Sequence, residues 1–161
     1  MHITIIAVGR MKTGPERELV SRYLDRAIAT GKQLGLSRFS VTELTESRAG
    51  SAKARKSEEA KAIKAAIPDG AVIIALDEHG KSLSSVGFSN QVSNWRDNGR
   101  AAICFLIGGA DGLDHSLLSS ADLSLAFSTF TWPHQLVRIM LAEQLYRTTT
   151  ILSGHPYHRG E

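Results

Sequence analysis

Short, continuous runs of apolar and β-branched residues recur along this chain, and they constrain its fold more than any other feature. The clearest are AVIIAL at 71–76 and AAICFLI at 101–107. Strands that are apolar throughout are typical of parallel sheets covered on both faces. Longer stretches with helical spacing separate these runs, which predicts an α/β fold built on a parallel sheet. We expect strands at 3–8, 39–44, 71–76, 101–107 and 123–127, and helices at 16–30, 85–96 and 134–146, with a lysine-rich helix ending at Ile67.

Three loops leave the carboxyl ends of predicted strands. They are the segments 77–82, 108–114 and 128–132. In open parallel sheets, ligands bind beyond the carboxyl ends of the strands. We therefore expect these three loops to form the binding site.

The length and the residue types bound the class of protein. The 161 residues are enough for a single domain, 1–161, with its own core. No run of about 18 apolar residues is present, and the N-terminus resembles no signal peptide. The single cysteine, Cys104, lies in an apolar run, where a small core residue is favoured over a catalytic thiol. These features predict a cytoplasmic protein without a membrane partner.

The basic charge is modest and concentrated in one segment. The formal net charge is +3, and the segment 51–64 carries five basic and two acidic residues, which accounts for the whole excess. On a helix, Lys53, Lys56 and Lys64 fall within about 60–80° of one another. Two interpretations remain open at this point: a solvated helix face, and a stripe that contacts phosphates.

The last predicted helix is apolar on nearly all sides. Pro133 suits a first helical position, where its missing N–H costs nothing. A helix that is apolar all round must be buried. Packing against both the sheet and a second subunit would bury it, so we expect a homodimer.

Two loops carry residues suited to a small ligand. In LIGGADGLD, 106–114, the adjacent Gly108 and Gly109 permit close backbone approach, although neither a Walker loop nor a GxGxxG fingerprint is present. In STFTWPHQLVR, 128–138, hydroxyl groups and aromatic rings precede a helix start and suit a planar purine. A plain tight turn and an aromatic helix entry are the structural alternatives.

The chain ends in SGHPYHRGE, 153–161, which is unusually rich in reactive side chains for a terminus. His155 and His158 are too few for a zinc site, and only His134 or Cys104 offer a third ligand, so we expect no metal. A Ser-His-Asp order and a nucleophile elbow are both absent, so hydrolase chemistry has no support.

Taken together, IGGADGL, TWPHQLVR, AEQLYR and HPYHR make the chain closely resemble the RlmH family. These are SPOUT-class methyltransferases that act on N3 of a pseudouridine in ribosomal large-subunit RNA. The resemblance covers the whole chain, and the order and spacing of the motifs are more specific than any one of them. Two departures are visible: Trp132 stands where leucine or phenylalanine is common, and Gly160 and Glu161 extend past HPYHR.

The resemblance implies S-adenosylmethionine (SAM) as methyl donor, a homodimer, and a trefoil knot made by the C-terminal segment. General topological rules would exclude the knot. The implied cofactor residues lie on the same three strand-end loops. They are Leu76, Gly108, Gly109, Ser128, Thr129, Phe130, Thr131, Trp132 and Pro133.

The resemblance also suggests a role for the C-terminal segment, which we expect to fold over the cofactor pocket of its own or the partner subunit. His155 or His158 would take the N3 proton or orient a water that does, because histidine is a usual general base near neutral pH. Tyr157 would stack on or hydrogen-bond the base. Arg159 would hold a phosphate or the uracil oxygen, and Arg138 is a second candidate, with pairing to Glu143 as its structural alternative.

The implied substrate is pseudouridine-1915 of 23S rRNA, in the usual rRNA numbering. Because the chain has no separate RNA-binding domain, we expect it to act on the assembled ribosome, with Lys53, Lys56 and Lys64 near phosphates. A buried acceptor that reads the N1–H would distinguish pseudouridine from uridine, with Asp77, Glu78 and backbone carbonyls as candidates. The alternatives are a SPOUT methyltransferase acting on tRNA and a non-catalytic ribosome-binding factor. From the order of strands and helices alone, a flavodoxin-like nucleotide-binding domain, which would have no affinity for SAM, is a further alternative.

Overall fold

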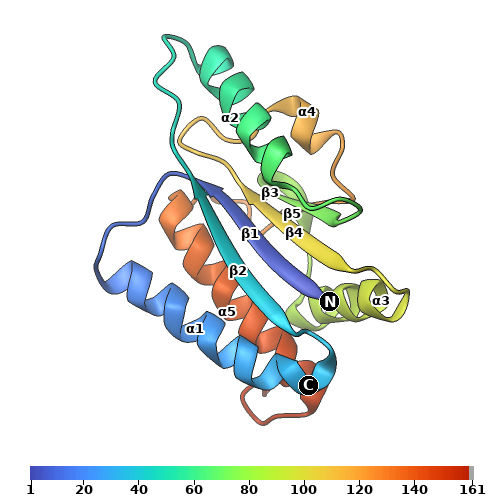
Figure 1. Cartoon of the computed structure of the whole chain (residues 1–161). Helices are drawn as coiled ribbons and strands as arrows, with labels where there is room; N and C mark the ends of the chain where they lie inside the picture. Colours follow the sequence, from blue (N-terminus) through green and yellow to red (C-terminus); the bar gives the residue numbers. More distant parts are fainter. Residues whose placement is uncertain (160–161) are drawn as a thin grey trace.

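The computed structural model describes residues 1–159 and contains one five-stranded sheet (Figure 1). Each pair of neighbouring strands is parallel, in the order β2-β1-β4-β3-β5. The predicted parallel α/β fold is therefore confirmed. The strands are β1 (His2–Val8), β2 (Arg38–Leu44), β3 (Val72–Ser82), β4 (Ala102–Ile107) and β5 (Leu123–Ala126).

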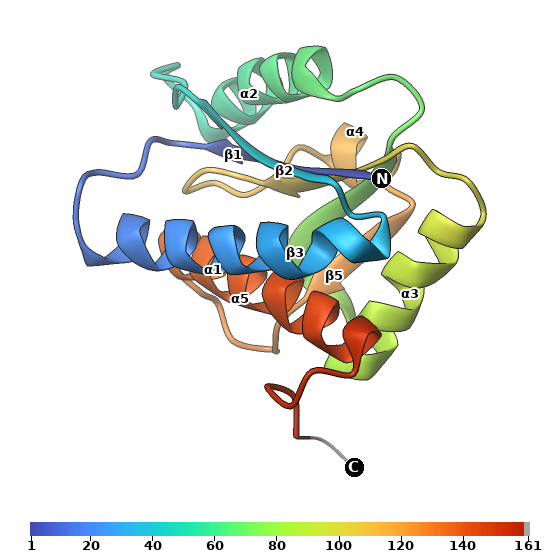
Figure 2. The same cartoon turned by 60° about the horizontal axis from the view of Figure 1, so that its bottom comes forward.

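Helices cover both faces of the sheet, as the apolar strands require (Figure 2). One face carries α1, α3 and α5, and the opposite face carries α2 and α4. A short 3₁₀ turn, η1, continues from α1. The bounds are α1 (Pro15–Gly31), η1 (Lys32–Leu34), α2 (Ala52–Ala66), α3 (Ser85–Asp97), α4 (His115–Leu118) and α5 (His134–Ser153).

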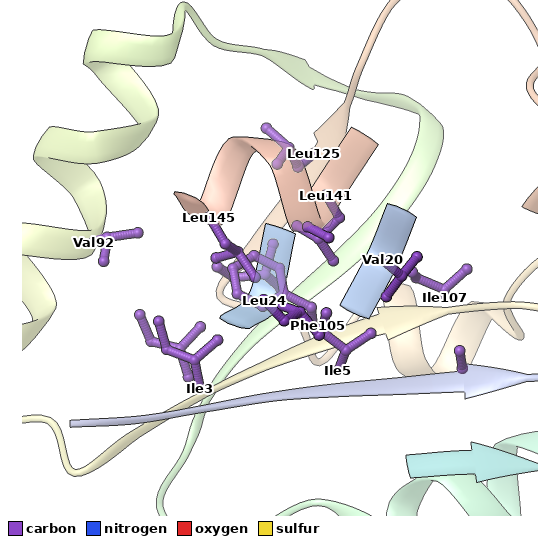
Figure 3. Close-up of a cluster of buried hydrophobic side chains, with 14 of the residues drawn as sticks. Ile3, Ile5, Val20, Leu24, Val92, Phe105, Ile107, Leu125, Leu141 and Leu145 are labelled. Carbon is purple, nitrogen blue, oxygen red and sulfur yellow. The ribbon is translucent and has the colours of Figure 1, made fainter. Parts of the chain in front are cut away.

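The alternation of side chains along the central strands produces two cores. On β1, Ile3 and Ile5 face the helices α1 and α5, whereas Ile6 and Val8 face α2. Figure 3 shows the larger core, where side chains from β1, β4, α1 and α5 meet around Phe105. Because successive residues of a strand point to opposite faces, covering both faces requires apolar residues at every position. This is why the central strands read as continuous apolar runs.

Local side-chain bonds explain where several helices begin. The Ser51 hydroxyl accepts the Ala54 backbone N–H at 3.2 Å, and α2 starts at the next residue after Ser51. Ser84 caps α3 and Asp114 caps α4 in the same way. Such caps satisfy backbone donors that have no partner inside the helix. Gly154 directly follows the last residue of α5 and caps it, with a φ of +68° that suits a glycine.

The strand β3 is longer than the predicted 71–76, and this corrects the expectation of a loop at 77–82. Leu76 and Lys81 both pair with Leu125, so the four residues between them bulge out before pairing resumes through Ser82. Gly80 allows this geometry, because a Cβ there would lie 2.7 Å from backbone atoms of Leu125. The polar residues 77–80 predict that the strand stops there. Pairing resumes at Lys81 because β5 lies alongside, and the sequence pattern of this segment does not show that.

The helix α5 also differs from its prediction. Pro133 occupies the N-cap with ψ of 135°, so the helix begins at His134 and continues to Ser153. The helices α1 and α3 of the same chain pack against α5, which also lies on the sheet. Elements of the same chain therefore bury most of the apolar side chains around α5. The apolar character of this helix is by itself no evidence for a second subunit.

Two further expectations concern the chain as a whole. Within residues 1–159, no helix combines the length and apolar character that a membrane span requires. The C-terminal knot stays a prediction, since strand order and pairing do not test it. Gly160 and Glu161, noted above as an extension past HPYHR, lie outside the described residues.

Candidate functional site

A cavity of about 450 Å³ lies beyond the carboxyl ends of β3, β4 and β5. Its wall comes mostly from the three segments expected to form the binding site and the strand ends before them. His134 and Val137 at the start of α5, Lys56 of α2 and Leu118 of α4 complete it. The bulge of β3 contributes Asp77 and Glu78. Seven of the nine predicted cofactor residues line this cavity, and Thr129 and Pro133 do not. The seven are Leu76, Gly108, Gly109, Ser128, Phe130, Thr131 and Trp132.

The glycine loop after β4 is folded tightly on itself. Gly109 and Gly112 form an antiparallel bridge, with the Gly112 N–H donating to the Gly109 carbonyl at 3.0 Å. A Cβ at Gly108 would lie 2.6 Å from the backbone carbon of Gly112, which no side chain tolerates. A Cβ at Gly109 would lie 3.1 Å from Cγ1 of Val8. Packing of the loop thus requires glycine at 108, whereas at 109 a side chain would press on the movable tip of Val8.

An ion pair joins α2 to this loop and was missed by sequence reasoning. Nε and Nη2 of Arg55 donate to the two carboxylate oxygens of Asp111 at 2.6 and 3.0 Å. The hydrogen bond from Arg55 lowers the pKa of Asp111, which also lines the cavity. The two residues lie 56 positions apart, and neither stands out in a chain with 19 basic and 16 acidic residues. The pair ties the glycine loop to α2, and the Arg55 charge compensates that of Asp111 at the cavity wall.

The loop between β5 and α5 is held by one hydroxyl group. Oγ of Ser128 accepts the Phe130 backbone N–H at 3.1 Å and the Trp132 indole N–H at 2.8 Å. The Phe130 and Trp132 rings meet edge to face at 6.3 Å between centroids. The Thr131 hydroxyl donates to Glu78 on the β3 bulge at 2.6 Å. These bonds place the aromatic rings at the cavity, with the Phe130 side chain 71% exposed.

The predicted basic contacts are distributed differently from expectation. Lys56 lines the cavity, and Lys53 is exposed in the first turn of α2. Nζ of Lys64, in the last turn, donates to the Ser116 hydroxyl at 2.9 Å. Lys53 and Lys56 thus lie near the carboxyl edge of the sheet, and Lys64 lies toward the other end of the helix.

Arg138 is not placed to contact a substrate, which corrects its expected role. It is only 2% exposed, and it donates to Glu43 and to the carbonyls of Val8 and Gly9. Its Nε has no hydrogen-bond partner. The alternative of a pair with Glu143 is also wrong, because Glu143 pairs with Arg147. A buried guanidinium in this position joins elements of the fold and offers no surface to a phosphate.

The C-terminal tail, residues 154–159, follows the far end of α5 (Figure 2). None of its residues lines the cavity. A helix of 20 residues spans about 30 Å. In this structure the segment therefore does not cover the cavity of its own chain, and whether it serves the partner's cavity stays a prediction. The Tyr157 hydroxyl donates to Glu143 at 3.0 Å, and Nη1 of Arg147 lies 3.2 Å from Nδ1 of His158. Burial, together with the bond to Glu143, raises the pKa of Tyr157 to about 12.

A family model described as predicted SPOUT methyltransferase matches residues 1–158 of this sequence. The chain belongs to the SPOUT methyltransferase family. The match spans the strands, the glycine loop, the 128–133 loop and most of the tail. It therefore covers every segment that contributes to the cavity.

Individual SPOUT relatives match over nearly the whole length. The chain is 56% identical to the Ribosomal RNA large subunit methyltransferase H of Allorhizobium ampelinum, and the alignment covers 99% of each chain. Identity to the protein of the same name from Rhodopseudomonas palustris is 54%, again over 99% of each. A solved structure, a probable methylase family protein from Haemophilus influenzae Rd KW20, aligns with a TM-score of 0.52 at 12% identity, covering 99% of this chain and 70% of that one. That likeness shows a shared fold.

This SPOUT chain offers no obvious metal centre in the part that the structure describes. Among residues 1–159, no three or more His, Cys, Asp or Glu side chains gather in a way that would hold an ion. Nδ1 of His155 accepts the Tyr157 backbone N–H within the tail, and Nδ1 of His158 lies 3.2 Å from Arg147 of α5.

Proposed function

We propose that this SPOUT protein transfers a methyl group from SAM to N3 of a pseudouridine in 23S rRNA, acting on the assembled ribosome in the cytoplasm. The single observation that carries the proposal is the convergence of seven predicted cofactor residues on one cavity. Relatives that are more than 50% identical to this chain are named as methyltransferases of large-subunit ribosomal RNA, which supports that RNA as the substrate. The position of the modified nucleotide, pseudouridine-1915 in the usual numbering, is part of the proposal.

The cavity suits SAM in size and in chemistry. Binding sites for small molecules commonly measure about 300–1,000 Å³ and combine apolar walls with few polar groups. Here Leu76 and Ile107 are apolar, Trp132 and Phe130 offer ring faces, and the Glu78 carboxylate offers a negative charge. SAM carries a positively charged sulfonium and supplies the electrophilic methyl group. The glycine loop holds backbone groups close to the bound cofactor, and Gly108 and Gly109 keep that loop closed.

The substrate side of the site is proposed to come from a second subunit. The tail lies at the far end of α5 from its own cavity, so in a homodimer this end of α5 would lie against the cavity of the partner. Phe130, Trp132 and Leu136 are large apolar side chains exposed beside the cavity, which supports a covered surface there. We further propose that 1–161 forms one domain and that the C-terminal segment forms the trefoil knot of the family.

Within that composite site, His155, His158 and Arg159 would contact the uracil ring and its phosphate. Methylation requires the N3 lone pair to face the methyl carbon in line. Much of the barrier reduction comes from holding both reactants in this geometry. Since Tyr157 donates its only hydroxyl proton to Glu143, its part is to anchor the tail rather than to hydrogen-bond the base as a donor.

The deciding experiment supplies methyl-labelled SAM together with whole ribosomes, free large subunits, bare rRNA or tRNA. We expect label in a pseudouridine of 23S rRNA, and most of it with whole ribosomes. Label in tRNA alone would establish a different SPOUT substrate. Particle binding without label anywhere, and with Gly108 variants still binding, would indicate a non-catalytic ribosome-binding factor.

A further inference from the structure

The hydrogen bond between Arg147 and His158 fixes which ring nitrogen of the histidine carries a proton. Nη1 of Arg147 lies 3.2 Å from Nδ1 of His158. A guanidinium has only donors and stays protonated in proteins. Nδ1 of His158 must therefore accept this bond with a free lone pair. A neutral imidazole that accepts at Nδ1 carries its proton on Nε2.

The second tail histidine is held in the same form. The Tyr157 backbone N–H donates to Nδ1 of His155 at 3.1 Å. A backbone N–H has no lone pair to offer, so Nδ1 of His155 is again the acceptor. Both histidines thus present an N–H at Nε2, which is a hydrogen-bond donor and cannot receive a proton.

A network at the end of α5 holds Arg147 in this position. Glu143 accepts from Nε of Arg147 at 3.0 Å, from its Nη2 at 2.5 Å, and from the Tyr157 hydroxyl at 3.0 Å. The Arg147 guanidinium also lies 4.9 Å from the centroid of the Tyr157 ring. Tyr157 in turn packs on Tyr146, with 4.6 Å between ring centroids. Each group is fixed by at least two contacts, so the donor to His158 is ordered before any substrate arrives.

We propose that Arg147 is a positioning residue that fixes His158 as a hydrogen-bond donor through Nε2–H, so that the tail does not remove the N3 proton of the substrate. This inference rests on the function proposed above. It replaces the sequence-based expectation that His155 or His158 acts as general base. The reacting pseudouridine is then an anion, and the tail stabilises its negative charge.

The bonds and charges balance without a protein base. The N3 proton leaves to solvent water, and the negative charge spreads onto the two ring oxygens of uracil. The Nε2–H of His158 donates to one of these oxygens, where an oriented donor in a closed site is most effective. The N3 lone pair then forms the bond to the methyl carbon, and the electron pair of the carbon–sulfur bond stays on sulfur. The anion and the sulfonium are both neutralised.

The first test measures the histidine rings directly in the full-length dimer. Nitrogen-15 NMR distinguishes a ring nitrogen that carries a proton from one that carries a lone pair. We expect His158 with its proton on Nε2 in the unmodified chain, and a mixture of both neutral forms in Arg147→Met. A proton on Nδ1 of His158 in the unmodified chain would overturn the proposal. Because no turnover is involved, this result is independent of whether the protein methylates RNA.

The second test uses single-turnover methylation of ribosomes. His158→Gln retains an N–H donor but cannot take up a proton, and we expect it to stay within about fivefold of the unmodified rate. His158→Ala loses the donor, which at comparable sites costs about 100-fold. The rate of the unmodified enzyme should rise with hydroxide concentration and show no histidine inflection between about pH 5 and 8. An inflection there that disappears in His158→Gln, with a rate as low as that of His158→Ala, would identify His158 as the base.

Variants of Arg147 distinguish a role in positioning His158 from a role in the general stability of the fold. Arg147→Met should lower kcat while leaving the KM for SAM unchanged, and Arg147→Lys should restore most of the rate because it keeps a charged donor. Arg26 provides the matched control, since its guanidinium lies 5.8 Å from the Tyr146 ring and has no hydrogen bond to the tail. Arg26→Met should leave kcat unchanged. Equal losses in the two methionine variants, or a higher KM for SAM in Arg147→Met, would contradict the positioning role.

Discussion

Nη1 of Arg138 lies 2.8 Å from Oε1 of Glu43, although the two residues are 95 positions apart. The same carboxylate oxygen accepts the Met11 backbone N–H at 2.8 Å. Nη2 of Arg138 reaches the carbonyls of Val8 and Gly9. Burial lowers the pKa of Arg138, and the charge of Glu43 opposes that effect. One guanidinium therefore joins β1, β2 and the start of α5 beside the cavity.

Replacing Glu43 should destabilise the fold even though no atom is lost from the core. Glu43→Gln leaves the buried charge of Arg138 without its counterion. Breaking a buried pair by changing one partner is strongly destabilising, and because Glu43 is 24% exposed we expect a loss of about 2–3 kcal/mol. Urea unfolding at neutral pH measures it.

Asp25→Asn is the control, since it removes one exposed negative charge on α1 that is not among the charges acting on Arg138. It should change the free energy of unfolding by less than about 0.5 kcal/mol. Equal losses of unfolding free energy in the two variants would mean that the overall charge of the protein, and not the buried pair of Arg138 and Glu43, accounts for the effect.

The glycine loop predicts a graded series of effects on SAM binding. Gly108→Ala forces backbone atoms of Gly112 apart, whereas Gly109→Ala presses on the tip of the Val8 side chain, which can turn aside. Overpacking costs about 1–3 kcal/mol. We expect the Kd for SAM to rise about tenfold or more in Gly108→Ala and by less in Gly109→Ala. Calorimetric titration of each variant with SAM measures the series.

Gly50 supplies the control for this series, because a Cβ there meets nothing within 4 Å. Gly50→Ala should bind SAM like the unmodified chain. Unchanged SAM binding in Gly108→Ala would show that the loop does not hold the cofactor.

The thiol of Cys104 should be inert in the folded protein. Burial raises the pKa of Cys104 to about 12, and the side chain is fully enclosed between the sheet and α2. The thiolate is the reactive form, so a thiol reagent at pH 8 should modify Cys104 only after unfolding. Rapid modification of the native protein, at a rate independent of denaturant, would contradict this burial.

The sheet and the cavity were predictable because they follow from periodicity and strand polarity. Strands such as Ala102–Ile107 are apolar at every position, which only a doubly covered sheet explains. Parallel strands then bring their carboxyl ends to one edge, so Gly108 and Ser128 had to lie near each other. The resemblance to a known family added the roles of these loops, which periodicity does not contain.

Other features could not be read from the sequence because they depend on distances between remote elements. The partner of Arg138 is a strand residue, whereas helical spacing suggested Glu143. The resumed pairing of β3 after Leu76 requires the position of β5. The place of the tail depends on the full length of α5, which extends to Ser153, beyond the apolar pattern that ends near Tyr146. Composition carries none of this information.

The basic start of α2 predicts a specific salt dependence of ribosome binding. Lys53 is exposed near the carboxyl edge of the sheet, and Lys56 lines the cavity. Each phosphate contact that is lost should reduce the slope of log K against log salt by about 1. We expect this reduction for Lys53→Glu. Lys32→Glu makes the same charge change in η1, away from that edge, and should leave the slope unchanged; equal slopes in both variants would exclude a local contact.

Mixed dimers test whether the tail serves the partner's cavity. One subunit carries Gly108→Ala and an intact tail, and the other carries an intact cavity but ends at Gly154. If each tail completes the other subunit's site, the mixed dimer has one working site of two and about half of the normal activity. If the tail served its own cavity, neither site would work, because each subunit would lack one component. Two different affinity tags isolate the mixed dimer, and each parent dimer alone should be inactive in both cases.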